Sequence, residues 1–230
     1  MLRSSWRGLA GLPASSAWRV RGARRGTSVV RACSASFRWI RASTRPGAIH
    51  PSEPVDGVTY RTGSLGDAAI REQAVAGADV VIGALAPRGE LEDSLAGVYR
   101  EVAGLAAAGG VRFGVVGGFS ALRPVEGAPR FYESGELPPE FAAEARAMGA
   151  VLDWLLSDAP QALDWFYVSP AGNYGSYVPG EDLGRYRIGG EVALFDAEGQ
   201  SAISGPDFAA AIVAEIDTPT HRRAQFSVAY

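Results

Sequence analysis

The sequence predicts an α/β protein with a mostly parallel sheet, helices on both faces, and a small hairpin and strand extension at the C-terminal end. Two observations indicate this fold class. Short apolar runs bounded by glycine or proline alternate with longer segments whose apolar residues share one helical face. The alternation repeats along the chain, and right-handed crossovers between parallel strands place the intervening helices over the sheet. A chain of 230 residues, 47% of them hydrophobic, can bury one core of moderate size.

The first predicted elements precede residue 87. Residues 58–62 form a short β-type run, and Asp67 can cap a helix that ends at about Ala76. Residues 78–86, ADVVIGALA, are apolar almost throughout, as in a strand that is buried on both faces. These residues predict a strand, a helix and a second strand.

Two pairs of a helix and a strand follow. Glycines end the first helix before the strand RFGVVGG at 112–118, and the second helix precedes the strand LDWFYV at 163–168. Each helix has one apolar face. The residues of the two faces are Leu91, Leu95, Val98, Val102 and Leu105, and then Phe141, Ala145, Met148, Leu152 and Leu155.

The C-terminal part predicts a hairpin, a helix and a final strand. Residues 186–188 and 192–195 would pair around two glycines. Pro206 begins a helix that ends at about Asp217, and the alternation of residues 225–230 predicts a final strand.

The first 52 residues differ in composition from the rest. They hold ten arginines and no acidic residue, whereas residues 53–230 hold 12 arginines and all 25 carboxylates. We therefore divide the chain into an irregular leader, residues 1–52, and one folded domain, residues 53–230. The composition of the leader is consistent with a transit peptide, a nucleic-acid-binding arm, a disordered segment or an out-of-frame translation. For the domain we expect no nucleic-acid and no membrane partner.

Missing residue types limit the chemistry. The chain has no lysine, which excludes Schiff bases and lysine-assisted proton transfer. Cys33 is the single cysteine, so no disulfide forms within the chain and a reducing compartment is adequate. No apolar run is long enough to span a bilayer. We expect a cytoplasmic protein without a metal site.

Small residues follow three of the predicted strands. In parallel sheets, ligands bind at the carboxyl ends of the strands, which here are residues 84–87 (ALAP), 117–120 (GGFS) and 169–171 (SPA). Small side chains would let a flat or phosphorylated ligand approach the backbone closely. Glycine and Ser-Pro after a strand are also ordinary turn residues, so the pattern leaves both explanations open.

From about Val58 to Tyr230 the sequence resembles the NAD(P)H-binding family of atypical short-chain dehydrogenases, which are often described as NADH-flavin reductases and are relatives of biliverdin reductase B. The order and spacing of several segments carry this resemblance. These segments are ADVVIGALAP at 78–87, VVGGFSAL at 115–122, LDWFYVSPA at 163–171, GRYRIGG at 184–190, SAISGPDFAAAIVAEID at 201–217 and the ending HRRAQFSVAY.

The resemblance implies a Rossmann-like domain that binds NADH or NADPH, with FMN or FAD as a candidate substrate. It places Ala84, Leu85 and Ala86 on the adenosine side, Val116, Gly117, Gly118 and Ser120 at the nicotinamide ribose, and Ser169, Pro170 and Ala171 at the nicotinamide ring. Ser120 is the candidate catalytic residue, because its hydroxyl could orient the carboxamide or donate a proton. Phe119 departs from the small residue that is usual at its position.

The same resemblance places a flat acceptor between the loops at 123–139 and 172–184. Their aromatic residues could stack on the acceptor or cover the edges of the core. These residues are Phe131, Tyr132, Tyr174 and Tyr177. We expect His221 at the surface, and Arg185 and Arg187 in solvent rather than on an anion.

Three functions remain open. The first is an NAD(P)H-dependent reductase that passes hydride to a flavin-like small molecule. This transfer depends more on stacking of the two rings than on a protein group that donates a proton. The second is a non-catalytic NAD(P)-sensing or protein-binding module, which the lack of an acid and base pair favours. A sugar-nucleotide epimerase is disfavoured, because the Tyr-xxx-Lys pair of short-chain dehydrogenases needs a lysine. Either a monomer or a homodimer is expected.

The Gly-rich loop that holds the pyrophosphate in such folds is missing from the sequence. Gly8, Gly11 and Ala14 have its spacing, but no apolar strand precedes them. In a shifted reading frame, the codons of residues 7–14 can encode GASGPTG, a fingerprint of the family. We therefore interpret residues 1 to about 50 as an out-of-frame translation of a dinucleotide-binding start, which would weaken cofactor binding.

Overall fold

The computed structural model describes residues 63–230, except residues 136, 176, 177 and 179. The predicted run at 58–62 and every interpretation of the leader lie outside the described residues. In the part of the chain that is described, no helix is long and apolar enough to cross a membrane.

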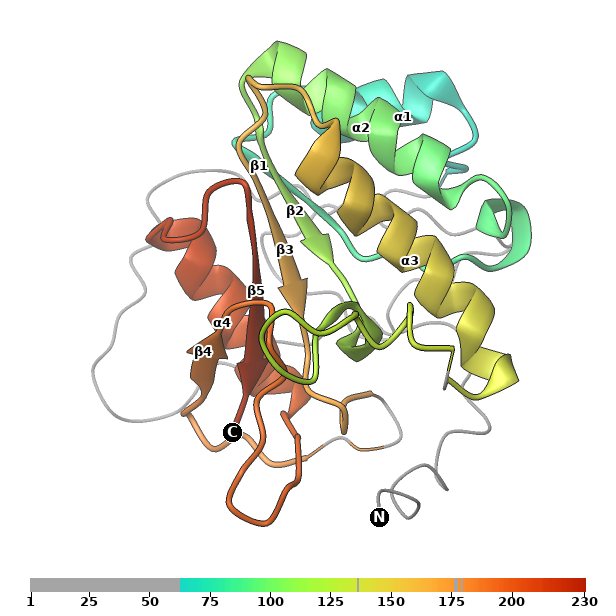
Figure 1. Ribbon diagram of the computed structural model, residues 1–230. Coiled ribbons are helices and arrows are strands. Elements are labelled where there is room, and N and C mark those ends of the chain that lie inside the picture. Colours follow the sequence, from blue (N-terminus) through green and yellow to red (C-terminus); the bar gives the residue numbers. More distant parts are fainter. Residues whose placement is uncertain (1–62, 136, 176–177, 179) are drawn as a thin grey trace.

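Five strands form one sheet in the order β1-β2-β3-β5-β4 (Figure 1). The first four strands of this order are parallel, and the last runs antiparallel to its neighbour. The mostly parallel sheet is therefore confirmed. The strands are β1 (Val80–Gly83), β2 (Arg112–Val116), β3 (Trp165–Ser169), β4 (Arg187–Gly189) and β5 (Ala224–Ala229).

Helices cover both faces of the sheet, as predicted. Figure 1 shows α2 (Leu95–Gly109) and α3 (Pro139–Ser157) on one face, with α1 (Ala68–Val75) packed beside α2, and α4 (Gly205–Asp217) on the other face. Successive side chains of a strand point to opposite faces. In β3, Trp165 and Tyr167 therefore join the core under α2 and α3, whereas Phe166 and Val168 join the core under α4.

The helix ends follow the signals in the sequence. Asp67 caps α1 by accepting a hydrogen bond from the N–H of Ala69 at 2.9 Å. Gly110 ends α2 in a left-handed conformation with φ of 65°, which an L side chain rarely adopts. Ser204 caps α4 by accepting from the N–H of Asp207 at 3.2 Å.

The predicted hairpin of residues 186–188 and 192–195 is wrong. β4 instead pairs with β5, where Ile188 lies opposite Val228. The backbone around Val192 pairs with Arg123: the Arg123 N–H donates to the Glu191 carbonyl at 2.8 Å, and the Ala193 N–H donates to the Arg123 carbonyl at 2.9 Å. Without β4, one edge of β5 would lack backbone partners, and Arg123 offers its N–H and its carbonyl to the segment around Val192. The two halves of the expected hairpin therefore pair with different partners.

Candidate functional site

Three adjacent parallel strands end at one edge of the sheet, where Gly83 lies beside Val115 and Val116 lies beside Val168. We call this edge, with the segments 84–87, 117–120 and 169–172 that follow the strands, the carboxyl rim. β1 and β2 are shorter than predicted, so most of these small residues lie outside the strands. The rim brings together every predicted site residue: Ala84, Leu85, Ala86, Val116, Gly117, Gly118, Ser120, Ser169, Pro170 and Ala171.

The three segments of the rim differ in exposure. Ala84 is exposed, and the segment from Gly117 to Ser120 is half-buried. In contrast, Ser169, Pro170 and Ala171 are buried. The first two segments can therefore be reached by a ligand from solvent, while the third is covered by its surroundings.

Two of the glycines at the rim leave room for buried tyrosine rings. An ideal Cβ on Gly117 would lie closer than 3.0 Å to the ring of Tyr167, and one on Gly83 would meet the ring of Tyr99. Real Cβ atoms essentially never come that close. Packing under the rim therefore explains these two glycines without a ligand.

Gly118 is different, because a Cβ there would meet only the Oγ of Ser120, at 3.7 Å. The space beside its Cα is open, and its φ of −118° is ordinary for any residue. Gly118 is thus the rim glycine at which a flat ligand could lie directly against the backbone. The described residues fit the nicotinamide half of a dinucleotide at this position. A pyrophosphate loop would precede residue 63, outside the described part.

The tyrosines under the rim are hydrogen-bonded and neutral. The hydroxyl of Tyr99 accepts from the N–H of Leu85 at 3.1 Å and so holds the segment after β1 in place. The hydroxyl of Tyr167 donates weakly to the Met148 carbonyl at 3.4 Å. Burial raises the pKa of both hydroxyls far above the ordinary value. Neither tyrosine can act as a base near neutral pH.

A buried arginine that the sequence did not single out fixes the rim from below. The Nη1 of Arg130 donates to the Ala121 carbonyl and to Oε1 of Gln225, both at 2.6 Å. Gln225 donates in turn to the Oγ of Ser169 at 3.1 Å. This network joins the turn Phe119–Ala121 to β3 and β5, and it engages the Ser169 hydroxyl. A contact between Ser169 and a cofactor stays a prediction.

Glu191 completes the network. Its Oε2 accepts from the Nε of Arg123 at 2.9 Å and from the Nη2 of Arg130 at 3.1 Å. The hydrogen bond from Arg123 outweighs the effect of burial and lowers the pKa of the Glu191 carboxyl. These residues are far apart in the chain and follow no periodicity, so no signal in the sequence could have grouped them.

Three of the four predicted stacking aromatics already pack against other groups of the protein. Phe131 stacks on Phe119, with ring centroids 4.9 Å apart and planes at 20°. The ring of Tyr132 lies against Gly149 of α3, and its hydroxyl donates to Asp153 at 2.7 Å. Tyr174 meets the ring of Phe208 at 4.8 Å. Tyr177 lies outside the described residues.

His221 keeps 23% of its side chain exposed, but the rest of the ring is engaged with neighbouring residues. Its ring stacks on Phe226 at 4.3 Å, and its Nδ1 lies 2.7 Å from Oε2 of the buried Glu215. Glu215 also binds Arg112 at 2.6 Å. Arg112 begins β2 and His221 precedes β5, so this cluster lies at the amino edge of the sheet, opposite the carboxyl rim. Arg185 and Arg187 are exposed, as expected.

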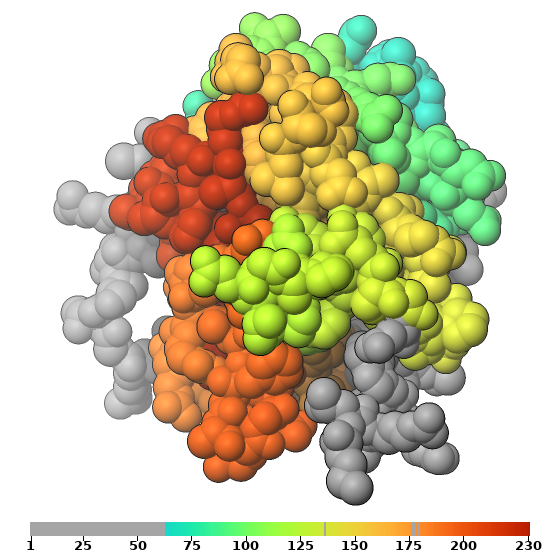
Figure 2. All heavy atoms as spheres, viewed as in Figure 1, coloured from blue at the N-terminus to red at the C-terminus, as the bar shows by residue number. Residues whose placement is uncertain are grey.

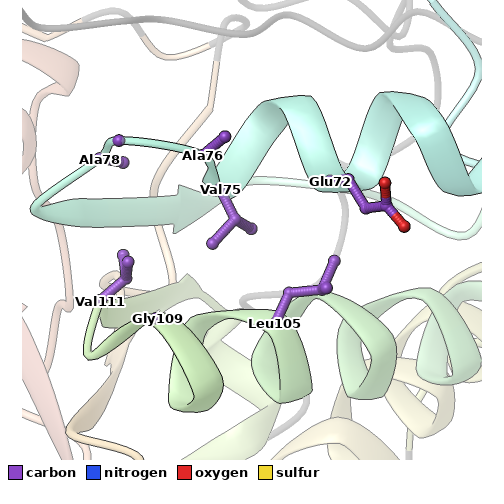
Figure 3. A pocket seen from close by; sticks show the side chains of 8 residues that line it. Glu72, Val75, Ala76, Ala78, Leu105, Gly109 and Val111 are labelled. Atoms are coloured by element: carbon purple, nitrogen blue, oxygen red, sulfur yellow. The ribbon is translucent and has the colours of Figure 1, made fainter.

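An apolar pocket of about 270 Å³ also lies at the amino edge, between the C-terminal ends of α1 and α2 (Figure 3). Val75, Ala78, Leu105 and Val111 line it, and Glu72 stands at one side (Figure 3). The pocket precedes β1 and β2 rather than following them. It is therefore separate from the carboxyl rim and does not contribute to the candidate site.

The parallel sheet with helices on both faces and small residues at the carboxyl rim defines a Rossmann-like nucleotide-binding fold. The sequence model described as NAD(P)H-binding matches residues 26–219. The chain belongs to this NAD(P)H-binding family. The match begins upstream of residue 53, so the boundary between leader and domain stays a prediction.

Three known proteins are similar to this chain in fold or sequence, and two of them bear more specific descriptions. A structure from Bacteroides thetaiotaomicron, described as a candidate epimerase, has a TM-score of 0.70 at 28% identity and covers 83% of this chain and 84% of that one. A candidate NADH-flavin reductase from Streptococcus pneumoniae TIGR4 has a TM-score of 0.65 at 25% identity, over 83% of this chain and 86% of that one. The uncharacterised protein YwnB of Bacillus subtilis is 30% identical over 115 residues, which span 50% of this chain and 52% of that protein.

Proposed function

We propose that this protein is an NAD(P)H-dependent oxidoreductase that transfers hydride to a flat, flavin-like acceptor. One observation carries the proposal: in a chain of the NAD(P)H-binding family, the carboxyl rim offers accessible backbone at Ala84 and Gly118. The similarity to the candidate NADH-flavin reductase of Streptococcus pneumoniae supports a reductase.

The residues of the rim would bind and orient the nicotinamide nucleotide. Ala84, Leu85 and Ala86 would face its adenosine, and Gly118 and Ser120 its nicotinamide ribose. The segment 169–171 would lie next to its ring, which requires the side chains that cover this segment to shift. When bound, the nicotinamide supplies a hydride from its C4 atom. The hydroxyl of Ser120 would orient the carboxamide or donate a proton. Tyr99 and Tyr167 are buried and their raised pKa makes them poor proton donors. The chain also has no lysine, so solvent is the other source of the proton.

The test uses the full chain with NADH or NADPH as the donor and FMN, riboflavin or a quinone as the acceptor. Oxidation of the donor is measured as the loss of nicotinamide absorbance. Nucleotide binding is measured separately by calorimetry. Binding together with turnover of any of these acceptors supports the reductase. If neither nucleotide binds, the proposal is wrong.

A non-catalytic NAD(P)-sensing or protein-binding module is the alternative. The burial of Tyr99 and Tyr167 and the missing lysine favour it, because the rim then lacks an accessible acid and base pair of its own. Tight nucleotide binding without turnover of any flat acceptor would support this alternative. The candidate epimerase of Bacteroides thetaiotaomicron raises a third function, but a chain without lysine cannot form the Tyr-xxx-Lys pair.

Two further features of the protein are part of the proposal. We place the protein in the cytoplasm, because a chain with a single cysteine needs no oxidising compartment. Its expected partner is the small-molecule acceptor.

A further inference from the structure

Three phenylalanines from three separate loops meet at the carboxyl rim. Phe119 follows β2, Phe131 lies in the loop before α3, and Phe195 lies between β4 and α4. Phe119 stacks on Phe131, and Phe195 meets Phe119 edge-on, with ring centroids 6.3 Å apart and planes at 87°. Figure 2 shows the loop after β2 lying against the segments that follow β3, as the pairing of Arg123 with Val192 requires. We call these three rings the phenylalanine cluster.

The exposed member of the cluster is Phe195, with 42% of its surface open to solvent. Its backbone is nevertheless held, because the Nη2 of Arg187 donates to the Phe195 carbonyl at 3.0 Å. The next residue, Asp196, closes a tight turn by accepting from the N–H groups of Glu198 at 3.1 Å and Gln200 at 2.7 Å. A ring exposed on a fixed backbone is preorganised to receive a planar ligand.

Other apolar side chains are exposed in the same loops. Among the described residues, five large hydrophobic side chains are exposed, and Val125, Leu183 and Phe195 are three of them. Val125 lies in the loop after β2, and Leu183 lies in the loop after β3. Phe195 lies close in sequence to Val192, which pairs with Arg123 of the loop after β2. Of these three side chains, Phe195 also belongs to the phenylalanine cluster and is therefore the one next to the carboxyl rim.

The charge of these loops disfavours an anionic ligand. The described residues of segments 119–138 and 172–203 include four arginines and seven carboxylates, which gives a net charge of −3. Arg123 and Arg130 are engaged with Glu191, and Arg187 with backbone carbonyls. From the described residues of these loops, a phosphate would meet a net negative charge, and most of their guanidinium groups are already occupied.

We propose that the acceptor is an uncharged planar molecule, of the riboflavin or quinone class, that contacts Phe195 of the phenylalanine cluster, and not a flavin that carries a phosphate. This inference rests on the proposed function and names its substrate class. The reaction balances with solvent: NAD(P)H and one proton reduce the acceptor by two electrons, giving NAD(P)⁺ and the dihydroflavin or hydroquinone. No further oxidant or reductant is needed.

Direct binding of riboflavin and of FMN to the full chain tests this inference without turnover. The two share one ring system and differ in the phosphate, and binding is followed by quenching of flavin fluorescence. We expect riboflavin to bind about fivefold more tightly than FMN at low ionic strength, and the difference to shrink as salt screens the loops. Phe195→Ala should weaken riboflavin binding about tenfold, because the stacking surface is lost.

Leu156→Ala is the matched control. Leu156 is 50% exposed, close to the value of Phe195, but it lies at the C-terminal end of α3 near the amino edge of the sheet. This variant should bind riboflavin as the unmodified chain does. Equal or tighter binding of FMN, no binding of riboflavin, or equal effects of the two variants would each overturn the inference. Riboflavin binding by a chain that binds neither NADH nor NADPH would instead overturn the proposed reductase, while the preference of this surface for an uncharged planar ligand would remain.

Discussion

The ring of Tyr167 occupies the space that a side chain at Gly117 would need. Tyr167 is fully buried in the middle of the sheet, and both its ring and its hydroxyl lie within 2.4 Å of the position that a Cβ on this glycine would take. A small residue at the end of a nucleotide-binding strand is usually attributed to the ligand. Here Gly117 is required by the packing of a neighbouring strand, while the adjacent Gly118 faces open space.

Gly117→Ala should therefore destabilise the protein. The added methyl group would push Tyr167 out of its place in the core, at a cost of about 2 kcal/mol. Urea unfolding measures this loss, and the same substitution in a Tyr167→Leu background should cost much less. Equal costs in the two backgrounds would show that Tyr167 is not the reason for this glycine.

Gly118→Ala should leave stability nearly unchanged but weaken nucleotide binding. The methyl group would meet only the Oγ of Ser120, and the backbone at Gly118 suits any residue, so stability should change by less than about 0.5 kcal/mol. The methyl group would, however, occupy the space proposed for the nicotinamide nucleotide, and we expect about tenfold weaker NADPH binding by calorimetry. Unchanged affinity would show that the nucleotide does not approach the backbone here.

Most of the fold follows from patterns that are local in the sequence. The apolar faces of α2 and α3, the cap at Asp67 and the glycine that ends α2 each depend on residues within a few positions of one another. The parallel order then follows from the alternation of strands and helices. The pairing of β4 was not predictable in this way, because it depends on the open edge of β5, about 40 residues away.

The candidate site was predicted only in outline. The three small-residue segments do meet at the carboxyl rim, because adjacent parallel strands end at the same edge. The sequence could not show that Gly83 and Gly117 accommodate tyrosine rings, or that Arg130 reaches Gln225 under the rim. It also gave no reason to notice Phe195. Such contacts join residues that the fold alone brings together.

Tyr230 ties the loop after β3 to the start of α4. Its hydroxyl donates to Oδ2 of the buried Asp207 at 2.6 Å and accepts from the N–H of Ser204 at 3.1 Å. Asp207 also accepts from the N–H groups of Leu183 at 2.9 Å and Gly184 at 3.0 Å. Burial alone would raise the pKa of the Asp207 carboxyl, but these hydrogen bonds, led by that of Tyr230, lower it.

Tyr230→Phe should therefore loosen the loop at residues 181–184. Losing the hydroxyl leaves Asp207 without its shortest hydrogen bond, and we expect a loss of about 1 to 2 kcal/mol in the free energy of unfolding. Amide exchange at Leu183 and Gly184 should also become faster. Tyr186→Phe, which removes a hydroxyl near the same core, is the control. Unchanged exchange at both amides would mean that Tyr230 does not hold this loop.

Glu215 makes stability depend on pH at the opposite edge of the sheet. Its side chain is 2% exposed. It accepts hydrogen bonds from Arg112, from Thr220 and from the N–H of His221. Burial would raise the pKa of this carboxyl, but the hydrogen bonds from these residues prevail and lower it from 4.5 to about 2.

Stability should consequently fall between pH 4.5 and about 2. A carboxyl whose pKa is lower in the folded than in the unfolded state stabilises the fold fully above the unfolded value, and this contribution disappears as pH falls through the folded value. For this shift the contribution is about 3 kcal/mol. Glu215→Gln should be less stable than the unmodified chain at neutral pH and should lose less stability on acidification, as urea unfolding at a series of pH values would show. Parallel pH curves for the two proteins would mean that Glu215 titrates normally and that the contacts with Arg112 and Thr220 do not hold its charge.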